Sequence, residues 1–95
     1  MHIISQKALR EFSAKHPEAR AGLEHWYQIM HKGTFQNLAE IRQVLPSTDL
    51  VGTYCVFNIG GNTARLIAAI HFNRQRLFIR AILTHAEYDK DKWKG

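Results

Sequence analysis

The sequence is poor in the features that mark secreted and membrane-spanning proteins. Its single cysteine, Cys55, cannot form an internal disulfide, which is typical of proteins from a reducing compartment. No apolar run approaches the ~18 residues that a membrane-spanning helix needs. The opening "MHIISQKALR" lacks the basic segment followed by an apolar segment that makes a secretory signal. We therefore expect a cytoplasmic protein that does not engage a membrane, with Cys55 as a buried core residue.

Motifs for metal ions and common cofactors are missing as well. The chain has six histidines, but their spacing matches no ligand motif such as HExxH. It has no Walker or dinucleotide-binding glycine pattern, and Gly60 and Gly61 are expected in a hairpin turn. It also has no internal repeat, no low-complexity segment and no Pro-, Gly- or Ser-rich linker. The sequence thus predicts one domain over residues 1–95, without a metal or a cofactor.

Positive charge is present in excess, and it is unevenly distributed. Residues 1–64 hold six Lys or Arg and five Asp or Glu, for a net charge of +1. Residues 65–95 hold seven and three, for a net charge of +4. A basic last third favours a polyanionic partner, of which nucleic acid is the commonest, although surplus lysines also serve solubility alone.

The first half has the apolar spacing of helices, after a short stretch, "MHIIS", that predicts a strand. The segment "SQKALREFSAKH" predicts a helix with Ser5 as its N-cap. A second helix is expected from Pro17, which suits a first turn, to Gly33, a candidate C-cap. A third is expected to open at Asn37 in a capping-box-like sequence and to end at Pro46. The apolar stripes of the second and third helices should lie in the core: Leu23, Trp26, Tyr27, Met30, Leu38, Ile41 and Leu45.

The second half has the residue types of strands. The segments "TYCVFNI", "ARLIAAIHF" and "RLFIRAIL" are rich in β-branched and aromatic residues and are separated by turn sequences. Helices followed by a run of strands indicate an α+β fold. We expect two or three helices packed on one face of an antiparallel sheet that ends in a three-strand meander.

The register of this meander determines which side chains share a face. Two-residue turns at Gly61-Asn62 and Arg74-Gln75 predict the pairs Asn58–Arg65, Val56–Ile67, Tyr54–Ala69, His71–Phe78, Ala69–Arg80 and Ile67–Ile82. One face is then apolar and should pack on the helices: Cys55, Phe57, Leu66, Ala68, Ile70, Phe72, Leu77, Ile79, Ala81 and Leu83. The other face carries Tyr54, Asn58, Arg65, His71, Phe78 and Arg80. An open face with two arginines, a histidine and aromatic rings indicates a binding surface.

The chain resembles the HigB-type toxins of the RelE-like toxin–antitoxin superfamily. The resemblance rests on the opening "MHIISQKAL", the "VFNIGGN" turn, the "RLIA" strand, "IR" in the last strand and, most specifically, "LTHAEYD". It implies a small α+β fold and cleavage of mRNA, usually on the translating ribosome. It also implies a small helix-turn-helix antitoxin that blocks the toxin in a hetero-oligomeric complex.

RNA cleavage without a metal needs proton-transfer groups and cations for the phosphorane transition state. The resemblance places Arg65 at the arginine of the family's middle strand, and His85 and Tyr88 at the basic and aromatic positions after the last strand. With Arg80, these are the candidate catalytic residues. The candidate RNA-binding residues are Asn58, His71, Arg74, Arg76, Lys90, Lys92 and Lys94. RelE-type toxins tend to carry lysines where this chain has Val56 and Asn58. Either its chemistry depends on His85, Tyr88 and the C-terminal lysines, or the chain cleaves RNA weakly.

Two other functions are compatible with the same residues. One is a non-enzymatic nucleic-acid or ribosome-binding module that uses the same cationic face. The other is a gyrase-inhibiting toxin of the same superfamily, which the pairing of His85 with Tyr88 disfavours.

Overall fold

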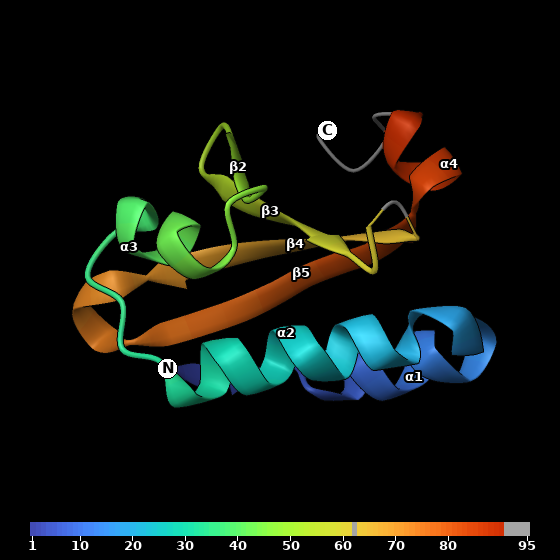
Figure 1. Cartoon of the computed structure of the whole chain (residues 1–95), viewed down its shortest axis with the longest axis horizontal. Coiled ribbons are helices and arrows are strands. Elements are labelled where there is room, and N and C mark those ends of the chain that lie inside the picture. The colour runs from blue at the N-terminus through green and yellow to red at the C-terminus, as the bar shows by residue number, and fades with distance from the viewer. Residues whose placement is uncertain (62, 91–95) are drawn as a thin grey trace.

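The computed structural model describes residues 1–61 and 63–90, and the expected α+β class is confirmed (Figure 1). Its elements are β1 (His2–Ile4), α1 (Lys7–Lys15), η1 (Pro17–Ala19), α2 (Arg20–Lys32), α3 (Leu38–Val44), β2 (Asp49–Val51), β3 (Tyr54–Ile59), β4 (Ala64–His71), η2 (Phe72–Arg74), β5 (Arg76–Thr84) and α4 (His85–Asp89). Within the described residues, no helix has the length and apolarity needed to cross a membrane.

The sheet is mixed, and the expectation of a purely antiparallel sheet is wrong at one edge. Its strand order is β1-β5-β4-β3-β2, and β1 pairs parallel to β5 while the other neighbours are antiparallel. A strand of three residues has too short a pattern to predict its direction, and β1 lies at the sheet edge beside β5. The three-residue strand β2 was not predicted because it is too short to show an alternating pattern.

The first hairpin has the expected register, whereas the second does not. Asn58 lies opposite Arg65, as predicted. In the second hairpin His71 lies opposite Arg76, so the predicted pairing with Phe78 is wrong by two residues. The loop contains the 3-10 turn η2 and then Gln75 in the left-handed region, with φ 52°. The Gln75 amide donates to the carbonyl oxygens of residues 35 and 72, at 2.6 and 2.8 Å, which stabilises this longer loop.

A β-bulge changes which side chains of β5 face the helices. The pairing shifts between Ile67 and Ala68, so that Arg80 is the extra residue on β5. Beyond the bulge, Ile82 packs against the core and Leu83 lies opposite Arg65. The expectation that Ala81 and Leu83 face the helices is therefore wrong, because one extra residue inverts the alternation.

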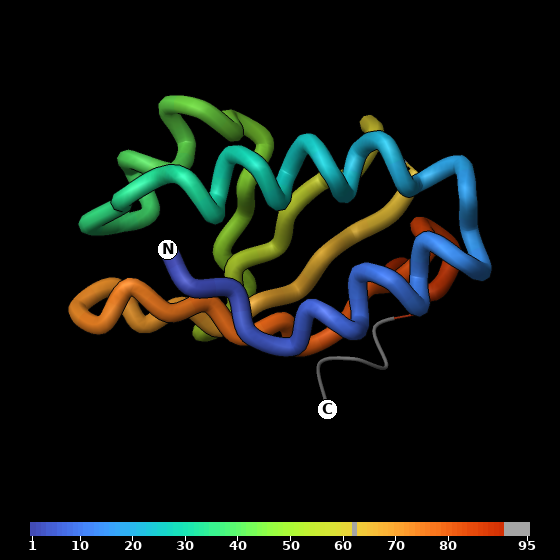
Figure 2. Tube along the Cα trace, turned by 90° about the horizontal axis from the view of Figure 1, so that it is seen from below, coloured from blue at the N-terminus to red at the C-terminus, as the bar shows by residue number. Residues whose placement is uncertain are grey.

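Helices α1 and α2 lie side by side across one face of the sheet, as Figures 1 and 2 show from two directions. The predicted apolar stripes lie in or against the core, and Cys55 is buried as expected. Trp26 meets Phe57 of β3 edge-on, with ring centroids 5.4 Å apart. Asn37 caps α3 as predicted, since its side chain accepts a hydrogen bond from the Glu40 amide. The N-cap prediction for Ser5 is wrong: Ser5 has φ 75°, and Gln6 precedes the helix.

Candidate active site

The segment after β5 forms a short helix, α4, which was not predicted from the sequence. A reciprocal capping box begins it: the Thr84 hydroxyl accepts from the Glu87 amide at 3.2 Å, and the Glu87 carboxylate accepts from the Thr84 amide at 2.9 Å. The sequence T-x-x-E is the known signature of this motif, so the helix had a readable signal that our sequence analysis missed. In Figure 1, α4 lies beyond the ends of β4 and β5, and on the opposite side of the sheet from α2.

Helix α4 brings Tyr88 onto Arg65. The guanidinium carbon of Arg65 lies 5.7 Å from the centroid of the Tyr88 ring, within the range of a cation–π contact. Arg65 is on β4, opposite Asn58 of β3 and Leu83 of β5, and one of its terminal nitrogens donates to the carbonyl oxygen of residue 64 at 3.2 Å. Two residues far apart in the sequence are thus joined, as the catalytic prediction requires.

His85 lies on the same short helix, three residues before Tyr88, so the two side chains project from neighbouring positions. Its Nε2 atom is 3.4 Å from a carboxylate oxygen of Asp89, one turn further on. The His85 side chain is 51% exposed, which leaves it accessible to a substrate. Lys90 follows the helix and is exposed. The predicted RNA-binding residues Lys92 and Lys94 lie outside the described residues.

The other predicted cationic residues form a separate group. His71, Arg74 and Arg76 are exposed around the β4–β5 loop. Arg65 and His71 are six positions apart on β4, a distance of about 20 Å along the strand. Arg80 is exposed at the bulge, between these two ends. The structure therefore places three predicted catalytic residues at one end of the sheet and the loop cations at the other.

The open face is less polar than the sequence predicts. Val56 is 3% exposed and its partner Ile67 is fully buried, although alternation directs both away from the helix-covered face. Val56 therefore cannot reach a phosphate from the position where related toxins tend to carry a lysine. Leu83 is half-buried next to Arg65 and was missed as a site residue, because no sequence signal marks the bulge that turns it there.

Two ionisable groups near or behind this site have shifted pKa values. The amide of Thr84 is the main cause that lowers the pKa of the Glu87 carboxyl, and His16 and Lys90 lower it further by their positive charge. Burial raises the pKa of the Cys55 thiol, and Arg42 opposes this only in part. Glu87 is consequently ionised at neutral pH, and Cys55 is a neutral thiol in the core rather than a nucleophile.

A family model described as HigB_toxin, the RelE-like toxic component of a toxin–antitoxin system, matches residues 19–91. The chain belongs to the HigB toxin family. It is 37% identical over 92 residues to the "mRNA interferase toxin HigB" of Escherichia coli (strain K12), covering 94% of this chain and 88% of that protein. It has the same identity and coverage with the "mRNA interferase HigB" of Shigella flexneri. With the "mRNA interferase HigB" of Escherichia coli strain CFT073 it shares 36% identity over 93 residues, covering 95% of this chain and 90% of that protein.

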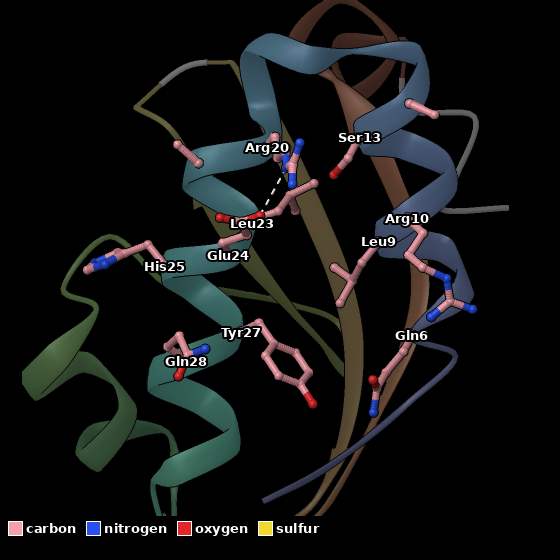
Figure 3. Close-up of a pocket in the computed structure, with 12 residues that line it drawn as sticks. Gln6, Leu9, Arg10, Ser13, Arg20, Leu23, Glu24, His25, Tyr27 and Gln28 are labelled. Carbon is pink, nitrogen blue, oxygen red and sulfur yellow. Dashed lines mark hydrogen bonds and ion pairs between the residues drawn. The ribbon is translucent and has the colours of Figure 1, made fainter.

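A groove of about 880 Å³ lies between α1 and α2 of this HigB-family chain (Figure 3). Leu9, Leu23 and Tyr27 point into it, and Arg20 and Glu24 form a 3.0 Å ion pair at its rim. None of the described residues that line it belongs to the predicted catalytic set. The groove therefore offers apolar contact area, whereas the Arg65–Tyr88 end offers phosphate-binding and proton-transfer groups.

In residues 1–61 and 63–90, no three His, Cys, Asp or Glu side chains gather closely enough to hold a metal ion.

Proposed function

We propose that this chain is the toxin of a type II toxin–antitoxin system and that it cleaves mRNA on the ribosome, without a metal ion. The observation that carries the proposal is the contact between Arg65 and Tyr88, which assembles a phosphate-binding group and an aromatic ring from distant parts of the chain. Support comes from the relatives, whose names describe them as mRNA interferases.

The reaction is an internal attack within the RNA. The 2′-oxygen attacks the adjacent phosphorus, the bond from phosphorus to the 5′-oxygen of the next nucleotide breaks, and a 2′,3′-cyclic phosphate and a 5′-hydroxyl result. One proton leaves the 2′-hydroxyl and one reaches the departing 5′-oxygen. Arg65 binds the non-bridging oxygens, whose charge rises in the transition state, with the forked geometry that suits phosphate.

His85 is the proton-transfer group of this proposal, because imidazole exchanges protons near neutral pH and is accessible here. Asp89, whose carboxylate lies 3.4 Å from the His85 Nε2 atom, orients the ring. Tyr88 keeps the Arg65 guanidinium in place with one face of its ring and stacks on an RNA base by its remaining surface.

Among residues 1–61 and 63–90, few cations lie on the strands beside Arg65, and this favours dependence on the ribosome. Val56 replaces a cation on the neighbouring strand, and Asn58 offers only neutral hydrogen bonds. A low intrinsic affinity for RNA is sufficient when the ribosome holds the mRNA in an extended conformation. The loop cations His71, Arg74 and Arg76 then serve as a second contact to RNA, about 20 Å away.

The partners that follow are mRNA, the ribosome and a helix-turn-helix antitoxin in a hetero-oligomeric complex, all in the cytoplasm. Primer extension on cellular mRNA after induction tests the proposal, with Arg65→Ala as the inactive control. We expect new 5′ ends within translated regions and none with the variant. DNA-damage signalling before any loss of translation would indicate gyrase inhibition instead. RNA binding without any cleavage would indicate a non-enzymatic module.

A further inference from the structure

Helix α4 carries His85 and Tyr88 but is only five residues long. Helices this short have little stability of their own in water, because the unfavourable free energy of nucleation exceeds the stabilisation from the hydrogen bonds of a single turn. The geometry of the site thus depends on whatever fixes the first turn of α4. In the described structure, the reciprocal hydrogen bonds of Thr84 and Glu87 fix that turn.

Thr84 also belongs to the sheet. It is the last residue of β5 and lies opposite Ala64, the residue before Arg65 on β4. The same residue therefore joins the strand ladder beside Arg65 and caps the helix that carries Tyr88. A change in the capping geometry alters the angle at which the chain leaves the sheet and moves Tyr88 relative to Arg65.

We infer that Thr84 and Glu87 are positioning residues, which hold Tyr88 against Arg65 and thereby set the geometry of cleavage. The effect on cleavage rests on the proposed function. The effect on the position of Tyr88 rests on the capping box and on the Arg65–Tyr88 contact.

The charge of Glu87 supports a positioning role over a role in RNA binding. An exposed carboxylate next to a phosphate-binding site repels RNA, so it weakens rather than strengthens binding. Its hydrogen bond to the Thr84 amide gives it a structural reason to be there. Glutamine can make the same hydrogen bond without the charge, and this separates the two roles.

The test compares paired variants with a control elsewhere in the chain. Thr84→Val and Glu87→Ala each remove one side of the box, whereas Thr84→Ser and Glu87→Gln keep it. Asn37→Ala removes the N-cap of α3, which is not connected to α4, and serves as the control for a lost cap. Each variant is assayed for kcat and KM on ribosome-bound mRNA, and its melting temperature is measured.

We expect Thr84→Val and Glu87→Ala to lower kcat by about two- to fivefold, comparable with the loss in Tyr88→Leu, because a lost N-cap typically shifts the helix population by about that factor. Thr84→Ser and Glu87→Gln should stay within about twofold of the parent, and Glu87→Gln should lower KM because a repulsive charge is gone. Asn37→Ala should lower the melting temperature and leave kcat unchanged. In a Tyr88→Leu background, Thr84→Val should reduce kcat little further. Wild-type kcat in both box-breaking variants, or full additivity with Tyr88→Leu, overturns the inference.

An NMR readout keeps the inference testable if the chain does not cleave mRNA at all. The Tyr88 ring shifts the resonances of the Arg65 guanidinium, so Tyr88→Leu defines the signal of a lost contact. We expect Thr84→Val to move the Arg65 Nε–H resonance toward its position in Tyr88→Leu. An unmoved resonance contradicts the positioning role, whereas absent cleavage with a moved resonance overturns only the proposed function.

Discussion

Arg65 and Tyr88 are 23 positions apart in the chain, yet the guanidinium carbon of one lies 5.7 Å from the ring centroid of the other. Arg65 lies near the start of the central strand, β4, and Tyr88 lies on the helix that follows the longest strand, β5. Their contact confines a long, flexible side chain to one region above the open face. Such preorganisation lowers the entropy that Arg65 loses on binding a phosphate.

Replacing Arg65 by alanine should remove most of the cleavage activity and leave the fold intact. The side chain is only half-buried, so its loss should cost less than about 1 kcal/mol of stability. Loss of one transition-state donor typically lowers kcat by ~10²-fold or more. Single-turnover cleavage and thermal melting are the measurements. Arg10→Ala, the same charge change on α1, is the control and should remain active; a folded, fully active Arg65→Ala protein would remove Arg65 from the site.

Two substitutions at Tyr88 distinguish a ring from a proton donor. Tyr88→Phe keeps the ring over Arg65, and we expect it to be nearly as active as the parent. Tyr88→Leu loses the cation–π contact, worth ~0.5–1 kcal/mol at an exposed site, and should be about two- to fivefold slower or more if base stacking is lost as well. If Tyr88→Phe were as damaged as a variant without a general acid or base, the hydroxyl would be the proton donor.

His85→Gln should bind RNA normally and cleave slowly. Loss of a general acid or base typically lowers the rate by ~10²-fold or more, which leaves about 1% of the activity. Glutamine retains the size and hydrogen-bonding ability of the side chain, so binding should change little. Asp89→Asn is the companion variant: it removes only the 3.4 Å ion pair and should have an intermediate rate. Rates and filter-binding affinities on the same RNA separate the two effects, and normal cleavage by His85→Gln would refute its role.

The order of α4 should depend on acid pH and not on pH near neutrality. Glu87 has a lowered pKa in the folded state, so its ionised form stabilises the fold. That contribution is complete above the ordinary value of 4.5 and is lost as the pH falls through the lowered value. Protection factors of the amides of residues 85–89, which correct for the intrinsic pH dependence of hydrogen exchange, should therefore be steady from pH 5 to 8 and fall in acid. Glu87→Gln should not show the acid step; an acid step of the same size in Glu87→Gln would contradict the role of the Glu87 charge.

The sequence was sufficient for the parts of the fold that depend on local patterns. The helix stripes with Trp26 and Met30, the cap at Asn37 and the first hairpin, where Asn58 faces Arg65, all follow from spacing and turn residues. The sequence was insufficient where one extra residue in a strand reverses which side chains face the helices. The bulge at Arg80 leaves no mark in an apolar run, so the facing of the last residues of β5 was inverted.

The residues of the candidate site remain predictions, and the sequence did not give their arrangement. Tyr88 and His85 were proposed from residue type and resemblance. Their helix was not predicted, because the segment is short and polar and the Thr84–Glu87 capping box was not recognised. The sequence did not show that Arg74 and Arg76 lie far from Arg65. Their distance depends on where β4 ends and the β4–β5 loop begins, and the predicted loop was too short.

The loop cations should affect RNA binding without affecting the chemical step. Arg74 and Arg76 are exposed at the end of the sheet remote from Tyr88, so they can contact phosphates that do not react. Replacing both by alanine should flatten the salt dependence of RNA binding by about 1.4 units of slope, given ~0.7 per phosphate contact on single strands. It should leave single-turnover kcat at saturating RNA within about twofold of the parent, because the reacting phosphate is bound by Arg65.

The control is a double variant of Lys7 and Arg10 on α1, which removes equal charge from another surface and should change the slope much less. An equal change of slope in both double variants would mean that RNA responds to net charge alone, and a fall in kcat would mean that the β4–β5 loop takes part in the reaction.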